Sequence, residues 1–437
     1  MRLAYICADF GVPLDGSKGA SVHVRELVRA LTELGHEVVI LTPAQAPPPA
    51  PAAPGSPAEA GSTLAGADSP SAPIAAGASC FTIGLDPTHK ALLETLRRAE
   101  DVIGRETRLR QELRNLLYNV SLFEAGLDIL RQERVDAVYE RYTLFAAAGL
   151  RLARELDVPH LLEVNAPLAD EQQRTRGLEL QSLAHETEYR ILRGSDAVLV
   201  VSEPLIEFAR SCGVPESRLH LVPNGVDPRR FDPARDREPL PGPLCARLAG
   251  RCVIGFVGTL KPWHGMDTLL EAFRLLHARL PETHLLVVGD GPGRSALEEG
   301  ARGADLAGAV TLAGAVAHGE VPDYVAAMDV TVAPGADEPG FYFSPIKVFE
   351  YMAMAKPVVA GAGHDLARVL PDDAAVLVEP GRPDTLADSL ERLVRDPAEC
   401  RRLGEAARAW VLRERTWAGN ARRVVELAAA LLAAEAR

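Results

Sequence analysis

The chain has 437 residues, enough for two domains of ordinary size, and its net charge of −13 argues against a general nucleic-acid binder. Its six cysteines form no C-x-x-C pair and its histidines show no metal-ligand spacing, which argues against a disulfide framework or a zinc site. The sequence has no run of eighteen apolar residues, and the start MRLAYICADF lacks the features of a signal peptide. We therefore expect a soluble cytoplasmic protein.

The first segment has the pattern of a βαβ unit. An apolar strand at residues 3–7 is followed by the loop DFGVPLDGSKGASVH, an amphipathic helix at about 21–34 and a second strand at 39–41. Gly16 and Gly19 would let the backbone approach a ligand at the carboxyl end of the first strand, where open α/β sheets bind. A surface loop that touches no ligand is the alternative.

Two segments interrupt this first domain. Residues 44–79 are mostly Ala, Pro, Gly and Ser, which predicts a disordered insertion to which we assign no function. Residues 90–136 have a helical pattern with nine Lys or Arg and nine Asp or Glu. A basic face there would suit docking on anionic lipid, but the balance of charges favours a solvated helical face.

Further apolar runs at residues 135–139, 160–164, 197–201 and 219–222 predict the remaining strands of the first sheet. Asn165 follows the second of these runs. Its amide can form a hydrogen bond with a ligand but cannot act as an acid or base, and a simple strand-end turn is the alternative. Glu171, on the next helix, could reach a hydroxyl of a ligand or could be a solvated helix start.

The second half repeats the architecture. Apolar runs separated by helical segments lie at residues 253–257, 284–288, 310–312, 330–333, 358–360 and 375–378, which predicts a second doubly wound domain. The loop GTLKPWHG after the first run contains Gly258, Lys261, His264 and Gly265, and its cations and N–H groups suit a diphosphate. The turn GDGPG lacks the G-x-G-x-x-G spacing, so we exclude a dinucleotide site.

Several chemical functions fall within residues 334–361. Ser344 and Pro345 predict a helix start, where the N–H groups of Ile346 and Lys347 and the Lys347 ammonium would attract a phosphate. Glu350 shares a helix face with Lys347 and could accept hydrogen bonds from ribose hydroxyls. An ordinary exposed helix is the alternative for this segment taken alone.

The form SPIKVFEYMA resembles the nucleotide-sugar site of the retaining glycosyltransferases of family 4, which have the GT-B fold. The resemblance implies an α/β protein of two Rossmann-like domains with a cleft between them, in which Glu350 holds the donor ribose. Tyr342 stands where many members have a glutamate that contacts the donor sugar, which leaves the sugar open.

The resemblance also implies the domain limits. PNGVD, with its turn at Asn224, is similar to the family's crossover between domains. We therefore expect an acceptor-side domain at residues 1–222 and a nucleotide-sugar domain at 223–412. The segment RTWAGNARRVVELAAALL is similar to the final helix of the family, which implies that residues 413–437 return to the first domain.

The candidate site residues fall into three groups. Thr259 and His264 stand where the family more often has Arg and Lys, and Gly289, Gly314 and Val316 follow strands in turns that the family also has near the donor. The expected catalytic residues are Lys261, Lys347, Glu350 and Asn165. Expected on the donor side are Gly258, Thr259, His264, Gly265, Gly289, Gly314, Val316, Glu338, Tyr342, Phe343, Ser344, Pro345 and Ile346. Expected on the acceptor or phosphate side are Gly16, Lys18, Gly19, His23 and Glu171.

We expect transfer of a sugar, with retention, from a nucleoside-diphosphate sugar to a saccharide, a lipid-linked acceptor or a small molecule. No cofactor or metal is expected, because cations and a helix end can stabilise the diphosphate and no D-x-D motif is suitably placed. Two rivals stay open. A silent binding or scaffold module would explain Tyr342, and a sugar-nucleotide 2-epimerase would need acids and a histidine around the sugar. Peripheral contact with the inner membrane face is compatible with the sequence but not indicated by it.

Overall fold

The chain folds into two units, each built on a parallel sheet. The computed structural model describes residues 1–437 apart from 17, 45–74, 304, 336–343, 364–365 and 436–437. The first unit comprises Met1–Gly16, His23–Val222 and Ala421–Arg437, and the second comprises Ser17–Val22 and Pro223–Asn420.

The first unit contains a seven-stranded sheet in the order β3-β2-β1-β4-β5-β6-β7, and every pairing is parallel. The order reverses between β1 and β4, which is the point where open α/β sheets bind their ligands. Its strands are β1 (Arg2–Cys7), β2 (Glu37–Pro43), β3 (Ala78–Ile83), β4 (Ala137–Arg141), β5 (His160–Val164), β6 (Ala197–Val200) and β7 (Leu219–Leu221).

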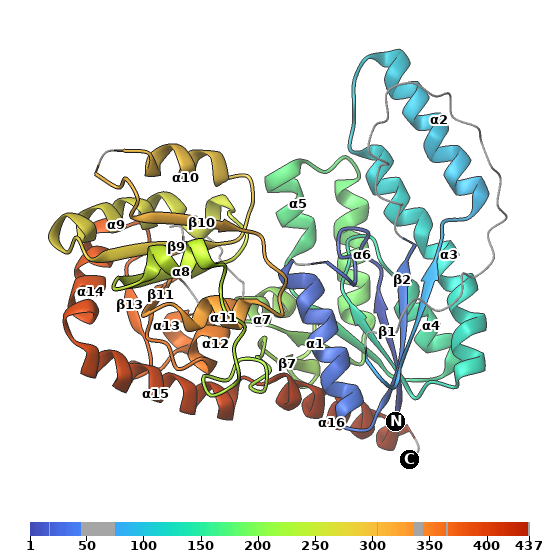
Figure 1. Cartoon of the computed structure of the whole chain (residues 1–437). Coiled ribbons are helices and arrows are strands. Elements are labelled where there is room, and N and C mark those ends of the chain that lie inside the picture. The colour runs from blue at the N-terminus through green and yellow to red at the C-terminus, as the bar shows by residue number, and fades with distance from the viewer. Residues whose placement is uncertain (17, 45–74, 304, 336–343, 364–365, 436–437) are drawn as a thin grey trace. The chain divides into compact units, whose positions relative to one another are not determined.

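Helices connect these strands and cover the sheet (Figure 1). The helix α3 packs against α4, β2 and β3, whereas α2 packs on α3 and buries none of its residues. The helices are α1 (Gly19–Glu33), α2 (Pro87–Ile103), α3 (Leu109–Glu133), α4 (Ala148–Leu156), α5 (Leu168–Arg176), α6 (Gln181–Gly194) and α7 (Glu203–Ser211), with a 3-10 turn η1 (Glu216–Arg218).

The end of the expected insertion differs from the prediction. The strand β3 begins at Ala78 and pairs along its length with β2, so residues 78 and 79 are ordered sheet rather than disordered insertion. This strand lies at the edge of the sheet and alternates buried and partly exposed residues, so it lacks the continuous apolar run of its neighbours. The rest of the expected insertion, from residue 45 to 74, lies outside the described residues.

The second unit contains a six-stranded parallel sheet in the order β10-β9-β8-β11-β12-β13, the same pattern with the reversal between β8 and β11. The prediction of two doubly wound domains is therefore confirmed. Its strands are β8 (Cys252–Val257), β9 (Thr283–Val288), β10 (Val310–Gly314), β11 (Val330–Ala333), β12 (Val358–Gly361) and β13 (Val376–Val378).

The helices of the second unit bury its sheet on both faces. Helix α9 packs against α14, and α12 packs against α15. The helices are α8 (Gly242–Leu248), α9 (Met266–Arg279), α10 (Arg294–Ala301), α11 (Val321–Ala326), α12 (Ile346–Ala353), α13 (Leu366–Val369), α14 (Pro383–Arg395) and α15 (Pro397–Glu414), with a 3-10 turn η2 (Pro262–His264). The last helix, α16 (Trp417–Glu435), begins in the second unit and continues from Ala421 in the first.

Each sheet has its own apolar core. Ile6, Val39 and Val138 form part of the core of the first unit, and Phe256 and Leu285 part of one core in the second. Burial on both faces explains why most strands read as nearly unbroken apolar runs. Within the described ranges, no helix is both long enough and apolar enough to span a bilayer.

Candidate functional site

Candidate residues of the second unit lie at the carboxyl ends of β8, β9 and β10, where glycines follow the strands. Gly258 and Gly289 have φ angles of 146° and 138°, a region that only glycine adopts readily. A Cβ on Gly258 would lie 2.6 Å from Lys347 Nζ, and one on Gly289 would lie 2.0 Å from the Gly258 carbonyl oxygen. The Gly289 N–H donates to the Gly314 carbonyl oxygen at 2.7 Å. These glycines make room for the Lys347 side chain at the edge of the sheet.

Lys347 lies in the first turn of α12, with its ammonium over an aromatic ring. Its Nζ is 4.1 Å from the ring centroid of Phe256. Burial lowers the pKa of Lys347 to about 7, against the opposing effect of the Glu350 charge. No described residue forms a hydrogen bond or ion pair with this Nζ. An anion that entered here would meet the ammonium and the N-terminus of a helix together.

The loop after β8 carries a second lysine. Lys261 Nζ lies 5.3 Å from the ring centroid of Trp263. His264 Nδ1 donates to the Thr259 carbonyl oxygen, and burial, together with the charges of Lys347 and Lys261, lowers the pKa of His264 to about 3. His264 is therefore neutral and holds the loop closed, so Lys261 supplies the positive charge in this loop.

Glu350 is buried on α12 and bonds to His318, in the loop after β10. His318 Nε2 lies 2.7 Å from Glu350 Oε1, and Arg230 Nη1 lies 2.8 Å from His318 Nδ1. The Glu320 carboxylate, just before α11, accepts from the Ala317 N–H at 2.8 Å.

Ser344 does not cap α12 as predicted. Its Oγ accepts from the Asn224 N–H at 3.1 Å, and its carbonyl oxygen accepts from Asn224 Nδ2 at 2.6 Å. The turn at Asn224 therefore uses the hydroxyl that the sequence assigned to the helix. Pro345 is the residue before the helix, without a side-chain cap, and Ile346 begins it half-buried.

The other donor-side candidates are spread around this edge. Gly265 stands before α9 with a φ of 67°, and Val316 is half-buried against the core. Glu338, Tyr342 and Phe343 lie outside the described residues.

Four side chains of the first unit surround one buried carboxylate. Glu163, near the end of β5, is bonded at Oε2 by His23 Nε2 (2.7 Å) and the Tyr139 hydroxyl. Its Oε1 accepts from Arg141 Nη1 at 2.6 Å and from Asn165 Nδ2. Burial opposes ionisation, but the charges of His23 and Arg141 and the bonds to this carboxylate hold the pKa of Glu163 well below its usual range.

This arrangement orients Asn165. Because its Nδ2 donates to Glu163, its carbonyl oxygen is the group left to meet a ligand, and no described residue donates a hydrogen bond to that oxygen. Asn165 is thus presented as an acceptor of a hydroxyl hydrogen at the carboxyl edge of the sheet.

The remaining candidates lie in the glycine loop and on α5. Gly16 accepts from Arg25 Nη1 at 2.6 Å through its carbonyl oxygen. Lys18 is exposed just before Gly19, the first residue of α1. Glu171 is half-buried in the first turn of α5.

Five residues of these two clusters were not among the candidates predicted from the sequence: Tyr139, Arg141, Glu163, Arg230 and His318. A signal was present for the first three, since charged and hydroxyl-bearing side chains inside a buried parallel strand need partners. For Arg230 and His318 the sequence contains no such signal, because each lies in a polar loop.

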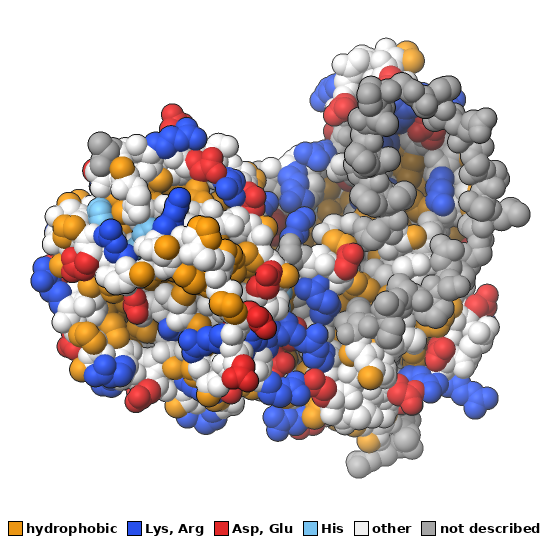
Figure 2. Space-filling model, in the orientation of Figure 1, with side chains coloured by type: hydrophobic (Ala, Val, Ile, Leu, Met, Phe, Trp, Pro, Cys, Tyr) orange, Lys and Arg blue, Asp and Glu red, His pale blue; other side chains and the backbone are white. Residues whose placement is uncertain are grey.

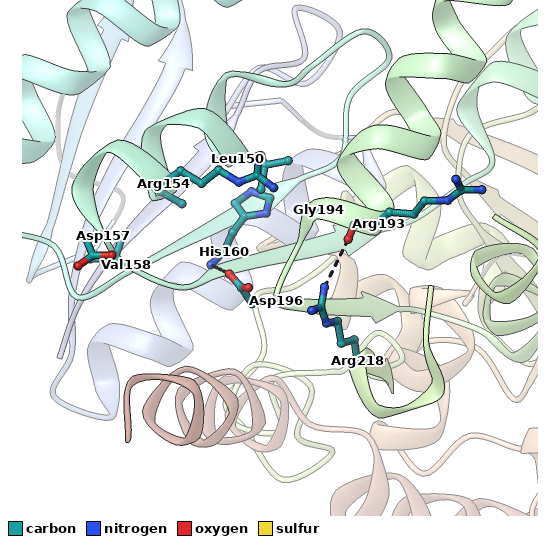
Figure 3. A pocket seen from close by; sticks show the side chains of 10 residues that line it. Leu150, Arg154, Asp157, Val158, His160, Arg193, Gly194, Asp196 and Arg218 are labelled. Carbon is teal, nitrogen blue, oxygen red and sulfur yellow. Dashed lines mark hydrogen bonds between the residues drawn. The ribbon is translucent and has the colours of Figure 1, made fainter. Parts of the chain in front are cut away.

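A cavity of about 340 Å³ lies elsewhere in the first unit (Figure 3). Asp157 and Val158 precede β5 and Asp196 precedes β6, so the cavity lies at the amino edge of the sheet, opposite to Asn165. Asp196 accepts from the His160 N–H at 2.9 Å, and Arg218 donates to the Arg193 carbonyl oxygen at 3.3 Å. None of the candidate residues is among those that line this cavity (Figure 3).

Two family models match the chain. The model described as Glycosyltransferase Family 4 matches residues 17–230, and the one described as Glycosyl transferases group 1 matches residues 251–396. A GDP-mannose-dependent alpha-(1-6)-phosphatidylinositol monomannoside mannosyltransferase of Mycobacterium tuberculosis is 30% identical over 66% of this chain and 76% of that protein. An alpha-D-kanosaminyltransferase of Streptomyces kanamyceticus is 28% identical over 59% of this chain and 66% of that protein.

Solved structures share the fold. A sucrose-phosphate synthase from Thermosynechococcus elongatus superposes with a TM-score of 0.67 at 20% identity, covering 99% of each chain. The HepE protein of Anabaena, in complex with UDP, superposes with a TM-score of 0.66 at 13% identity, covering 98% of this chain and 100% of that one. The chain described above therefore has the GT-B fold of two Rossmann-like domains.

Proposed function

The chain belongs to the glycosyltransferases of family 4, and from this premise we propose that it transfers a sugar from a nucleoside-diphosphate sugar to an acceptor hydroxyl with retention at the anomeric carbon. The donor would bind at the carboxyl edge of the second sheet. The acceptor would bind at the corresponding edge of the first.

The donor assignment rests on two side chains that share one face of α12, the Lys347 ammonium and the Glu350 carboxylate. Lys347 lies in the first turn of the helix, its ammonium forms no hydrogen bond or ion pair with a described residue, and Glu350 follows on the same face about 4.5 Å along the axis. A diphosphate at the helix start and a ribose beside the carboxylate match this spacing. Lys347 and the helix N-terminus would then stabilise the charge that develops on the leaving diphosphate.

Lys261 supplies the second cation of the proposed donor site. It contributes to the lowered pKa of His264, as does Lys347, so both ammonium groups lie near that ring. Two cations and a helix end can neutralise a leaving diphosphate, and we propose that catalysis needs no metal ion. Activity that is unchanged by excess EDTA would agree with this, and activity that requires added Mg²⁺ or Mn²⁺ would contradict it.

Asn165 is the proposed orienting residue on the acceptor side. Its carbonyl oxygen, fixed by the bond of Nδ2 to Glu163, can accept a hydrogen bond from a sugar hydroxyl. The amide cannot exchange a proton at neutral pH, so it would position the reactants rather than act as an acid or base.

The first test measures nucleoside-diphosphate release from UDP-, GDP-, ADP- and TDP-sugars, with and without a pool of acceptors from a cell extract. Acceptor-dependent release from one donor is expected, and the anomeric configuration of the product, read by NMR, tests retention. Glu350→Ala should abolish binding of that donor, whereas Glu207→Ala, at an exposed position of α7, should not. Unchanged binding by Glu350→Ala would overturn the ribose assignment.

The two rivals give different results in the same assay. A silent module would bind a nucleotide sugar without turnover under every acceptor condition. A 2-epimerase would convert the donor into its 2-epimer without any acceptor. Either result would replace the proposed transfer.

A further inference from the structure

Arg230, His318 and Glu350 form a chain of hydrogen bonds in the second unit. Arg230 Nη1 is 2.8 Å from His318 Nδ1, and His318 Nε2 is 2.7 Å from Glu350 Oε1. The side chains of His318 and Glu350 are 13% and 7% exposed, so the contact between them is shielded from water. The three residues come from the crossover loop, the loop after β10 and α12.

The chemistry of the three groups fixes the direction of the bonds. An arginine guanidinium stays protonated and only donates, so His318 Nδ1 must accept and carries no hydrogen. The neutral imidazole then has its hydrogen on Nε2 and donates it to Glu350 Oε1. Arg230 therefore sets the tautomer with which His318 holds the carboxylate.

The bond to His318 keeps the Glu350 carboxylate from pairing with Lys347. Glu350 and Lys347 are three residues apart on one helix face and interact electrostatically, yet these two described side chains form no ion pair within 4.0 Å. If Glu350 turned to Lys347, the carboxylate would cancel the charge offered to a phosphate. With Oε1 held by His318, Glu350 Oε2 receives no hydrogen bond from any described residue.

We propose that Arg230 and His318 are positioning residues that hold Glu350 so that its carboxylate meets the ribose hydroxyls of the donor and leaves Lys347 to the diphosphate. The proposal rests on the proposed function, since it assumes a nucleoside-diphosphate donor at α12. Neither residue needs to touch the reacting atoms.

The test takes the ribonucleoside diphosphate that the release assay selects from UDP, GDP and ADP, and compares it with its 2′,3′-dideoxy analogue by isothermal titration calorimetry. His318→Ala should weaken binding of the preferred ribonucleotide about tenfold or more and leave the dideoxy analogue within about twofold, because the analogue lacks the hydroxyls that Glu350 binds. Glu350→Gln should show the same selective loss. His318→Gln, whose amide N–H can replace Nε2–H, should restore most of the ribonucleotide binding.

Arg230→Met provides an independent variant at the far end of the chain of bonds. It should show the same selective loss in weaker form, and the matched control Arg229→Met should show none, because Arg229 is exposed and pairs with Asp227. In the transferase assay, the donor KM of His318→Ala should rise more than its kcat falls. If His318→Ala does not fold, the Arg230→Met and His318→Gln pair decides.

The outcomes distinguish a failure of the proposed function from a failure of the positioning proposal alone. If the wild type binds neither nucleotide, or binds ribo and dideoxy forms equally, the proposed function at Glu350 fails and the positioning proposal fails with it. If Glu350→Gln shows the selective loss but neither His318→Ala nor Arg230→Met does, or if both weaken the dideoxy analogue equally, the positioning proposal alone is overturned.

Discussion

Lys347 combines two opposing effects in one side chain. The face of the Phe256 ring attracts a cation, but burial disfavours the charge, and burial dominates in lowering the pKa to about 7. Without a bound anion, Lys347 is therefore only partly protonated at neutral pH. A bound diphosphate would favour the charged form and raise the pKa again.

This predicts that nucleotide binding takes up a proton. At about pH 8.5 the free Lys347 is almost entirely neutral, so binding of the preferred nucleoside diphosphate should take up about one proton. Calorimetry in two buffers of different ionisation enthalpy measures the number of protons taken up on binding. Lys347→Arg, which is always charged, should abolish the uptake, while Lys261→Arg should keep it. Equal uptake by wild type and Lys347→Arg would show that another group titrates.

At the scale of elements, the site depends on how three strands end side by side. Gly258 donates from its N–H to the Val288 carbonyl oxygen at 2.9 Å, and Gly289 donates to Gly314 at 2.7 Å. The backbones of neighbouring loops thus touch without intervening side chains. This close approach places the Lys261 loop next to α12.

We therefore predict that Gly289→Ala strongly destabilises the second unit. The added Cβ would lie 2.0 Å from the Gly258 carbonyl oxygen at a φ of 138°, so strain and displacement together should cost at least about 2 kcal/mol. Gly319→Ala is the matched control, since a Cβ there meets nothing within 4 Å. Denaturant unfolding checks this, and equal midpoints for the two variants would refute it.

At the scale of the molecule, charge is distributed rather than concentrated. Acidic and basic side chains are interspersed over the face seen in Figure 2, although the net charge is −13. The coupling around Glu163 in the first unit is internal, because this carboxylate is buried among its partners. Its folded pKa lies below the unfolded value of 4.5, so the ionised carboxylate adds stability above about pH 4.5 that is lost as the pH falls.

We predict that Glu163→Gln is less stable than the wild type near neutral pH, and that the difference shrinks between about pH 6 and about pH 3. The cause is that the Glu163 carboxyl of the unfolded chain takes up a proton over this range, whereas the folded carboxylate stays ionised. Glu207→Gln, at an exposed site of the same unit, should differ little from the wild type at either pH. A difference for Glu163→Gln that stays constant with pH would contradict the coupling.

Much of the fold follows from local patterns in the sequence. Buried parallel strands need apolar residues on both faces, which is why residues 253–257 and 160–164 were recognisable as strands. Glycines after strands indicated where backbone approaches closely, and the i, i+3 spacing put Lys347 and Glu350 on one face of a helix. The weakly patterned edge strand β3 was missed, because only one of its faces is well buried.

The sequence by itself thus determined the two doubly wound domains and the helix that carries Lys347 and Glu350. Only the tertiary structure decided which side chains meet. Glu350 bonds to His318, which lies 32 residues earlier in the chain, and His318 bonds to Arg230, which lies 88 residues before that histidine. Glu163 bonds to His23, which lies 140 residues earlier. Such partners are set by how strands and loops are juxtaposed across the sheet, and no local periodicity records that arrangement.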